Sequence, residues 1–245
     1  MMIVDMHCHI LPGVDDGPES MEDTIAVLKE AQRQGIDTMI VTPHFHPGRY
    51  VVKASVVLET LGKVRRQAAA EGIAIRLLPG QECYYYSGLI NELDAGNVLT
   101  MNRTKYVLIE FDNETQYSTI TFAVRELRSN GYKPIIAHFE RYRCLYNHIE
   151  RLEELRKRGA TLQLNFDRLL DKGNFFHPNG WRKLLKDGYV DFLGSDTHGM
   201  GFRPLHVDKA VEWLEKYDDL YDRIMDENIK KLIPMPTLSA HSYFE

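Results

Sequence analysis

Two histidines separated by one residue end the first apolar run of the chain, which spans residues 3–9 (IVDMHCH). In an extended strand, residues i and i+2 point to the same side, so the imidazoles of His7 and His9 can reach one point. Histidine is the commonest metal ligand in proteins. The pair therefore indicates a metal site, although an isolated H-x-H motif also occurs at polar strand ends that face solvent.

Similar polar residues recur at the ends of the later apolar runs. They are His44 after the second run, Glu82 after the third, Glu110 in the fourth, His138 after the fifth, Asn165 after the sixth, and Asp196 and His198 after the seventh. Chance would not place five of the ten histidines and three carboxylates at the same end of successive runs. Imidazole and carboxylate without thiolate suit Zn, Mn or Fe(II) and argue against a structural cysteine–zinc site. The pattern predicts a metal centre that holds several ions.

The loop after His9 contains a further candidate ligand, Asp16, in the sequence DDGP. This sequence is equally typical of a turn, so the role of Asp16 stays open at this point. The other five histidines fall in predicted helices or loops, where isolated polar residues are usually solvated. We expect them to be surface residues: His46, His148, His177, His206 and His241.

The elements that position these residues are predicted from five glycines that end a helical segment and precede a β-rich run. They are Gly35, Gly72, Gly131, Gly159 and Gly188. Glycine is the usual helix stop because it adopts the left-handed conformation at little cost. The pattern predicts strands at 3–9, 36–42, 73–78, 105–110, 132–137, 160–164 and 189–193. It predicts helices at 21–34, 55–71, 87–94, 118–130, 148–158, 178–187 and 205–217.

Seven strands that alternate with helices favour an α/β fold with a parallel sheet, most economically closed as a barrel. An open doubly wound sheet is the alternative, but no glycine-rich phosphate fingerprint follows the first strand. In βα barrels the chemistry lies at the C-terminal ends of the strands, where the candidate ligands are. We expect one domain over residues 1–233 and a loosely held tail at 234–245, which contains two prolines.

The composition of the 245-residue chain is globular, with 44% hydrophobic and 27% charged residues. A net charge of −5 and the lack of a long Lys/Arg block argue against a nucleic-acid partner. The three cysteines are scattered, which suits a reducing compartment, and none has the C-x5-R spacing of a cysteine-nucleophile phosphatase. Without a signal peptide or an apolar run long enough to insert in a membrane, we expect a cytoplasmic protein.

The combined motifs resemble the PHP (polymerase and histidinol phosphatase) superfamily. They are H-x-H at the N-terminus, T-x-H after the second strand, G-x-E after the third, a carboxylate on the fourth, A-H-x-E-R after the fifth and S-D-x-H after the seventh. The sequences VDDGP, GQE before three tyrosines, and AHFER look like the bacterial PHP-type protein-tyrosine phosphatases of capsule and exopolysaccharide clusters. The resemblance spans about residues 5–203. It implies a distorted, TIM-like (β/α)7 barrel with three divalent metal ions, usually manganese, with iron and zinc as alternatives.

The resemblance also implies a role for each matching residue. One ion would be held by His7, His9, Glu82 and Asp196, a second by Glu82, Glu110 and His138, and a third by Asp16, His44 and His198. Arg141 and Arg203 fall where this branch places phosphate-binding arginines, and a planar guanidinium suits phosphate. Structural roles for them are an ion pair with Glu140 and a residue at a helix start. Cys8 alternates away from the ligands and is expected to pack in the core.

The function implied is hydrolysis of phosphotyrosine, with the tail of a bacterial tyrosine kinase of capsular or exopolysaccharide synthesis as the partner. Tyr84, Tyr85, Tyr86 and Phe45 either line a cleft for the aromatic substrate or pack in the core. A histidinol-phosphate or other small-molecule phosphatase is the main alternative. A PHP nuclease and a catalytically silent metal-binding regulator are further alternatives, which the acidic charge and the intact ligand set respectively disfavour.

Overall fold

A computed structural model gives the fold and describes residues 2–171, 180–201 and 203–234. The predicted tail from 235 onward, the start of the helix predicted at 178, His177 and His241 lie outside these residues. None of the described helices combines the length and the apolar character that crossing a bilayer requires.

The strands form two groups, and parallel pairing joins the strands named here within each group. In the first group β1 (Val4–Cys8) pairs with β2 (Thr38–Val41), which pairs with β5 (Arg76–Pro79). The second group runs in the order β10 (Phe192–Gly194), β9 (Thr161–Asn165), β8 (Lys133–Ile136), β7 (Tyr106–Glu110), β6 (Glu82–Tyr84) and β3 (His44–His46). The seven predicted strands are all present, and the predicted parallel α/β fold is confirmed.

Two of the predicted strands, at 36–42 and 73–78, end close to where they were predicted to end, but each is followed by a short strand that belongs to the second group. Pro43 separates β2 from β3, because proline cannot donate a backbone hydrogen bond. Gly80 separates β5 from β6 at a close approach, where an added Cβ would lie 3.0 Å from the Met101 sulfur. β3 and β6 then pair with His44 opposite Glu82. The sequence did not predict the short strands β3 and β6, nor the antiparallel pairing of β3 with β4 (Tyr50–Val51).

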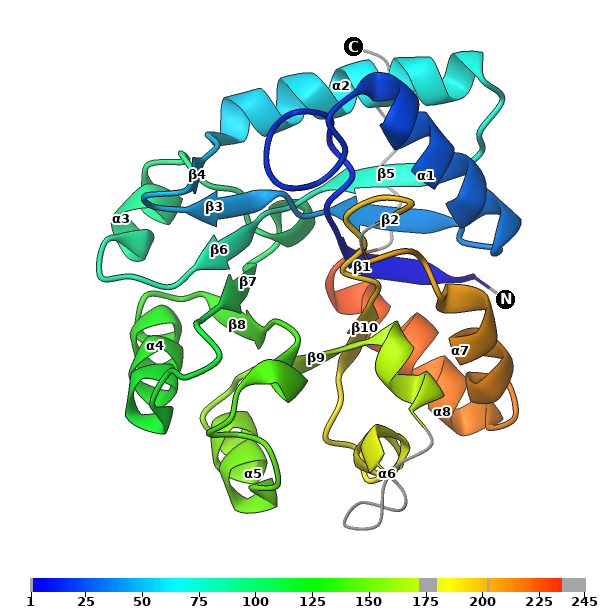
Figure 1. Cartoon of the computed structure of the whole chain (residues 1–245). Coiled ribbons are helices and arrows are strands. Elements are labelled where there is room, and N and C mark those ends of the chain that lie inside the picture. Colours follow the sequence, from blue (N-terminus) through cyan, green and yellow to red (C-terminus); the bar gives the residue numbers. More distant parts are fainter. Residues whose placement is uncertain (1, 172–179, 202, 235–245) are drawn as a thin grey trace.

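The first and last strands lie side by side (Figure 1). An isolated parallel bridge joins Cys8 to Thr197, and the Asp196 backbone N–H donates to the His7 carbonyl at 2.8 Å. Gly194 permits this contact, because an added Cβ would lie 2.5 Å from the His7 Cβ. This pairing brings the ends of β1 and β10, which carry ligands from opposite ends of the chain, to one place.

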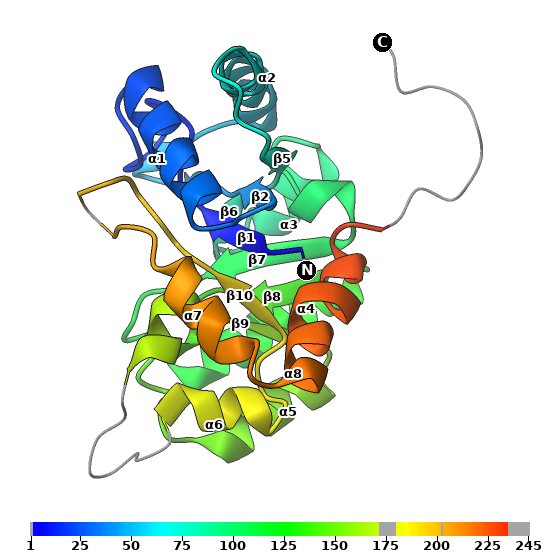
Figure 2. The same cartoon turned by 90° about the vertical axis from the view of Figure 1, so that its right-hand side faces the viewer.

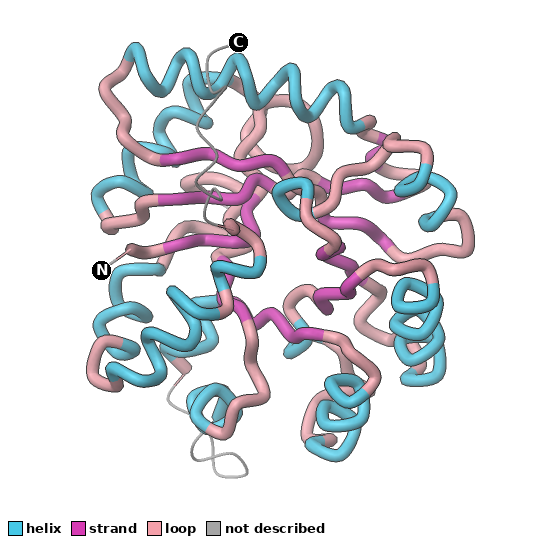
Figure 3. Tube along the Cα trace, turned by 180° about the vertical axis from the view of Figure 1, so that it is seen from behind, coloured by secondary structure: helices cyan, strands magenta, loops and turns pink. Residues whose placement is uncertain are grey.

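The helices lie around the outside of the strands (Figures 1, 2 and 3). They are α1 (Met21–Arg33), α2 (Ala54–Ala70), α3 (Leu89–Asp94), α4 (Tyr117–Ser129), α5 (Ile149–Lys157), α6 (Gly180–Lys186) and α7 (Val207–Leu214). The five predicted stop glycines all have a positive φ, between 70° and 89°. α7 is shorter than predicted. α8 (Asp218–Asp222) and the π-helix that follows it (Arg223–Glu227) were not predicted.

Both faces of the strands are buried, as in barrels whose strands are covered by helices. Ile40 and Leu108 belong to a small cluster, together with Ile229 and Leu232 near the end of the described chain. Their neighbours along the same strands, such as Met39 and Val107, belong to the large cluster that includes the helices. Burial on both faces holds the strand ends, and therefore the polar residues on them, in fixed positions.

Candidate metal centre

The nine predicted ligands converge at the C-terminal ends of the strands. The side chains of His7 and His9 leave β1 on the same side, and their Nε2 atoms are 3.1 Å apart. Each Nε2 lies 3.2 Å from Oε2 of Glu82, which β6 brings in from the other group of strands. All three residues are fully buried.

Glu82 lies at the centre of the cluster. Its Oε1 is 2.8 Å from Nε2 of His138, which follows β8. Its Oε2 is 3.3 Å from Nδ1 of His44 on β3. One carboxylate therefore approaches imidazoles from three different strand ends, which is the position of a bridging ligand.

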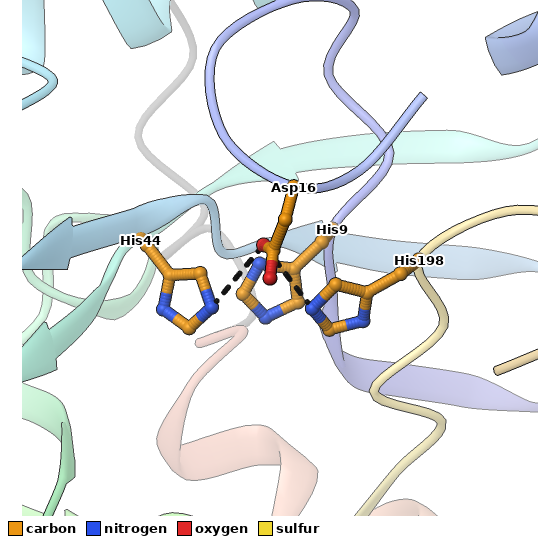
Figure 4. A group of neighbouring side chains, drawn as sticks. All are labelled: His9, Asp16, His44 and His198. Atoms are coloured by element: carbon orange, nitrogen blue, oxygen red, sulfur yellow. Dashed lines mark ion pairs between the residues drawn. The ribbon is translucent and has the colours of Figure 1, made fainter. Parts of the chain in front are cut away.

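A second group of side chains surrounds Asp16 (Figure 4). Its Oδ1 lies 3.4 Å from Nε2 of His44 and 3.4 Å from Nε2 of His198. The His9 and His198 rings stack with their centroids 4.1 Å apart. Donor atoms of His9, Asp16, His44 and His198 all lie within 4.8 Å of one another, a spacing that one ion can span. The turn that holds Asp16 thus points its carboxylate into the cluster.

Glu110, the last residue of β7, completes a third group with His44 and Glu82. Its Oε1 is 3.0 Å from Nδ1 of His44, and its Oε2 is 3.9 Å from Nε2 of His138. His44 therefore faces Asp16 with one ring nitrogen and Glu110 with the other. The division of the nine residues among three ions stays a prediction, because His9 and His44 each belong to two groups.

Asp196 connects the histidines to both predicted phosphate-binding arginines. Its Oδ1 lies 3.6 Å from the Nε2 atoms of His7 and His9. Its Oδ2 accepts a hydrogen bond from Arg141 and another from Arg203, whose Nη1 is 3.3 Å away. The predicted alternative for Arg141, an ion pair with Glu140, is absent from the ion pairs of the described residues. Both guanidinium groups thus lie at the edge of the cluster.

Unusual backbone conformations aim three of these side chains. His138, Asp196 and Arg203 have φ values of 28°, 53° and 48°, a region that residues other than glycine rarely adopt. Such conformations persist where the surrounding structure imposes them, and they concentrate at functional sites. His138 and Asp196 each come two residues after a strand end, and Arg203 lies in the segment between β10 and α7; the side chains of all three contact the cluster.

Several buried polar residues hold the ligands but were not predicted. Asp15 accepts a hydrogen bond from His9 Nδ1 at 2.8 Å and one from the His44 backbone N–H at 3.0 Å. Gln163 Oε1 lies 3.0 Å from His7 Nδ1 and accepts from the His138 backbone N–H. Such partners fix the tautomer and orientation of metal-binding imidazoles.

Asp5 fixes the loop after β10 to the first strand. Its carboxylate accepts hydrogen bonds from the Ser195 backbone N–H at 2.8 Å and from the Ser195 hydroxyl at 2.5 Å. Burial raises the pKa of this carboxyl to about 6. The sequence contained a signal for this role, because Asp5 lies on the same face of the strand as His7 and His9.

The charges of the cluster are strongly coupled. Burial lowers the pKa of His9, but the hydrogen bond with Asp15 and the adjacent Glu82 carboxylate outweigh this effect and raise the pKa to about 9. Burial likewise acts against His44, whose pKa the Glu110 carboxylate helps to raise to about 9. Burial raises the pKa of Glu82, yet the neighbouring histidines bring it well below its usual value. The carboxylates of this site thus favour positive charge beside them.

The donor set fits divalent metal ions. Glu82 Oε2 and His44 Nδ1 are buried without a hydrogen-bond partner among the described residues, although buried polar atoms normally have one. Both atoms are of the kinds, carboxylate oxygen and imidazole nitrogen, that bind Zn, Mn and Fe. A bound cation would satisfy both atoms and the charge of the carboxylates.

A cavity of about 190 Å³ opens above the cluster. It is lined by Asp16, His44, His46, Arg49, Tyr50, Glu82, Tyr84, Glu110, Phe111, Asp112, His138, Arg141, Asp196 and Arg203. Tyr84 thus lines the cleft, and its hydroxyl donates to Asp112 at 2.7 Å. Tyr85 and Tyr86 pack against the core, and Phe45 is buried in it.

The remaining sequence predictions concern residues outside the ligand set. His46 was expected at the surface but is half-buried, because it stacks on Tyr84 at 4.1 Å and lines the cavity. His206 is exposed, as predicted, and His148 is partly exposed, with 42% of its side chain accessible to solvent. Cys8 is buried away from the ligands, as predicted, and its Sγ lies 3.4 Å from the Ile40 carbonyl oxygen.

Comparison with solved structures first places the fold. A lactonase engineered for organophosphate hydrolysis matches with a TM-score of 0.55 at 15% identity, over 94% of both chains. At this identity the likeness shows the fold alone. A chain from the crystal structures of YwqE from Bacillus subtilis and CpsB from Streptococcus pneumoniae, described as unique metal-dependent tyrosine phosphatases, matches with a TM-score of 0.85. It is 31% identical over 94% of each chain.

Residues 3–234 match the family described as "Capsular polysaccharide synthesis, CpsB/CapC". The chain belongs to this family. The tyrosine-protein phosphatase YwqE of Bacillus subtilis is 33% identical over 96% of this chain and 93% of its own length. The tyrosine-protein phosphatase CpsB of Streptococcus pneumoniae is 31% identical over 87% of this chain and 90% of its own length.

Proposed function

We propose that this chain is a metal-dependent protein-tyrosine phosphatase. The observation that carries the proposal is the cluster of imidazoles and carboxylates around Glu82, with two arginines at its edge. Relatives named as tyrosine-protein phosphatases support it, because they match across most of the chain.

Each group of residues has a role in phosphomonoester hydrolysis. Divalent ions held by the imidazoles and carboxylates around Glu82 would supply positive charge for the phosphoryl oxygens and would lower the pKa of a water molecule. Arg141 and Arg203 bind the phosphoryl oxygens through their planar guanidinium groups. Tyr84 and His46 also line the cavity, and their rings are the proposed contacts of the substrate's aryl ring.

The leaving group explains why the site needs no strong general acid. The phenol of tyrosine has a pKa of about 10, so the phenolate leaves more readily than an alkoxide. The proposal includes three ions, most often manganese, distributed over His7, His9, Asp16, His44, Glu82, Glu110, His138, Asp196 and His198. The tail of a bacterial tyrosine kinase in capsular or exopolysaccharide synthesis is the proposed substrate. A cytoplasmic location is part of the proposal, because the three cysteines are free.

Substrate comparison tests the function. Purified protein with added Mn²⁺ is assayed on a phosphotyrosine peptide, on the same peptide with phosphoserine, and on histidinol phosphate. We expect kcat/KM for the phosphotyrosine peptide to exceed the other two by about 100-fold or more, because only the phenolate leaves without protonation. A larger kcat/KM for histidinol phosphate would favour the small-molecule phosphatase instead.

A further inference from the structure

A second cavity of about 630 Å³ adjoins the metal centre, and the proposed mechanism does not use it. It shares Glu110, Phe111, His138, Arg141 and Arg203 with the smaller cavity. The two cavities therefore diverge from the arginines that are proposed to bind phosphate. The volume of the second cavity is in the range of ligand pockets, about 300–1,000 Å³.

Basic side chains line the second cavity away from the metal ligands. Arg168, from the 3-10 helix Phe166–Leu170 after β9, lies on its wall, and the exposed His206 lies at the start of α7. Arg141 and Arg203 lie on the wall that both cavities share. The second cavity has one carboxylate in its lining that the smaller cavity lacks. It belongs to Asp167, whose side chain is half-exposed.

The guanidinium of Arg168 is only loosely paired. Its Nη1 lies 3.5 Å from Asp171, and its Nε lies 3.8 Å from Glu140 and 4.0 Å from Asp167. These distances are at or beyond the limit of a hydrogen bond. The Nε atom is buried and has no hydrogen-bond partner among the described residues. Arg168 therefore retains donors for a ligand that enters the cavity.

We propose that the second cavity is a peptide subsite that accepts an anionic side chain close to the phosphotyrosine, with Arg168 as its main contact and His206 at its rim. The inference rests on the proposed phosphatase function. With the phosphate at the shared wall and the aryl ring beside Tyr84, the second cavity is left for the adjacent part of the peptide. The anion is a carboxylate or a second phosphate, since a guanidinium binds both bidentately.

Matched peptides test the subsite. Phosphotyrosine peptides that carry alanine, glutamate or a second phosphotyrosine next to the reacting residue are compared by kcat/KM. We expect kcat/KM to be about tenfold higher for the anionic peptides, mainly through a lower KM. The net contribution of a hydrogen bond to a charged group corresponds to about this factor. The glutamate and phosphotyrosine arms distinguish a carboxylate subsite from a phosphate subsite.

Two substitutions assign the preference to the cavity. Arg168→Gln is expected to reduce the ratio of kcat/KM between anionic and neutral peptides to about one, and Arg168→Lys to retain part of it. His206→Glu, at an exposed position, is expected to lower the same ratio by placing a negative charge at the rim. Arg158→Gln is the control, because this exposed arginine of the α5 C-terminus pairs with Glu154 at 2.8 Å.

The outcomes separate this inference from the function on which it rests. No hydrolysis of any phosphotyrosine peptide or of phenyl phosphate would overturn the phosphatase proposal itself. Hydrolysis with equal kcat/KM for neutral and anionic peptides would overturn only the subsite. An anionic preference that survives in both Arg168→Gln and His206→Glu would overturn it as well. If Arg168→Gln also loses turnover of phenyl phosphate, the ratio measured for His206→Glu decides.

Discussion

Glu82 is the residue on which the metal centre depends most. Its carboxylate oxygens lie between 2.8 and 3.3 Å from the imidazole nitrogens of four histidines, His7, His9, His44 and His138. Those histidines come from both groups of strands. The loss of this one charge therefore affects every part of the cluster.

Glu82→Gln keeps the shape of the side chain and removes its charge. We expect metal affinity to fall by about 100-fold or more, since even residues that only support metal ligands cost about 10–100-fold. Isothermal titration of the metal-free protein with Mn²⁺ measures this change. Glu59→Gln on α2 is the control, because Glu59 is exposed and forms an ion pair with Lys63 at 2.7 Å. Equal affinity in Glu82→Gln and the control would contradict the bridging role.

Arg141 is the more buried of the two arginines that contact Asp196, with 22% of its side chain exposed. We expect Arg141→Ala to lower kcat on a phosphotyrosine peptide by about 100- to 1,000-fold, the usual cost of removing one donor that stabilises transition-state charge. Steady-state kinetics of this variant, beside Arg158→Ala, check the prediction. A change confined to KM would mean that Arg141 binds substrate and transition state equally.

Eight of the nine predicted ligands could be found from the sequence because they lie at the ends of apolar runs, whereas Asp16 lies in a loop and was implied only by the resemblance. The residues that hydrogen-bond to these ligands were harder to predict from the sequence. Gln163 lies in the middle of an apolar strand, and its contact with His7 exists only because β10 lies between β9 and β1 and brings their side chains together. Asp15 adjoins the predicted Asp16, but nothing in the sequence distinguishes the carboxylate that supports His9 from the one that faces the other ligands.

At the scale of elements, the contact between β1 and β10 places the last ligands beside the first. Gly194 makes this contact possible, because an added Cβ would meet the His7 Cβ at 2.5 Å and the Gln163 amide at 3.2 Å. We expect Gly194→Ala to lower the free energy of unfolding by about 1–3 kcal/mol, the cost of overpacking. Chemical denaturation measures it. Gly201→Ala is the control, since an added Cβ there meets nothing within 4 Å.

An ion pair on α1 gives a pH-dependent contribution to stability. Hydrogen bonds from Arg33 and Gln34 lower the pKa of Glu30 to about 2, below its ordinary value of 4.5. Ionised Glu30 therefore stabilises the fold above pH 4.5, and this contribution is lost as the pH falls towards 2. We expect Glu30→Gln to lower Tm by about 1–2 °C at neutral pH and by less near about pH 3. An equal difference at both pH values would argue against it.

The regular elements were predicted within a few residues, because glycine stops and apolar runs are local signals. The short strands β3 and β6, which follow Pro43 and Gly80, were not predicted, since a proline or glycine after a strand indicates that the strand has ended. β3 and β6 have only three residues each, too few for a periodic pattern. Their pairing depends on contacts between distant segments, and so does the position of His46 beside Tyr84.

At the scale of the whole molecule, the fold collects ligands from residue 7 to residue 198 at one end of the strands. Ions that bind the folded cluster and not the unfolded chain would stabilise the fold by mass action. The central claim is that the same bound ions make the cluster hydrolyse phosphotyrosine.

The most direct test is a titration of metal-free protein with Mn²⁺, in which bound metal per chain and turnover of a phosphotyrosine peptide are measured in the same samples. We predict no turnover without metal and a rise in turnover that follows the amount of bound metal. Undiminished turnover in the metal-free protein, or none when metal is fully bound, would contradict the account.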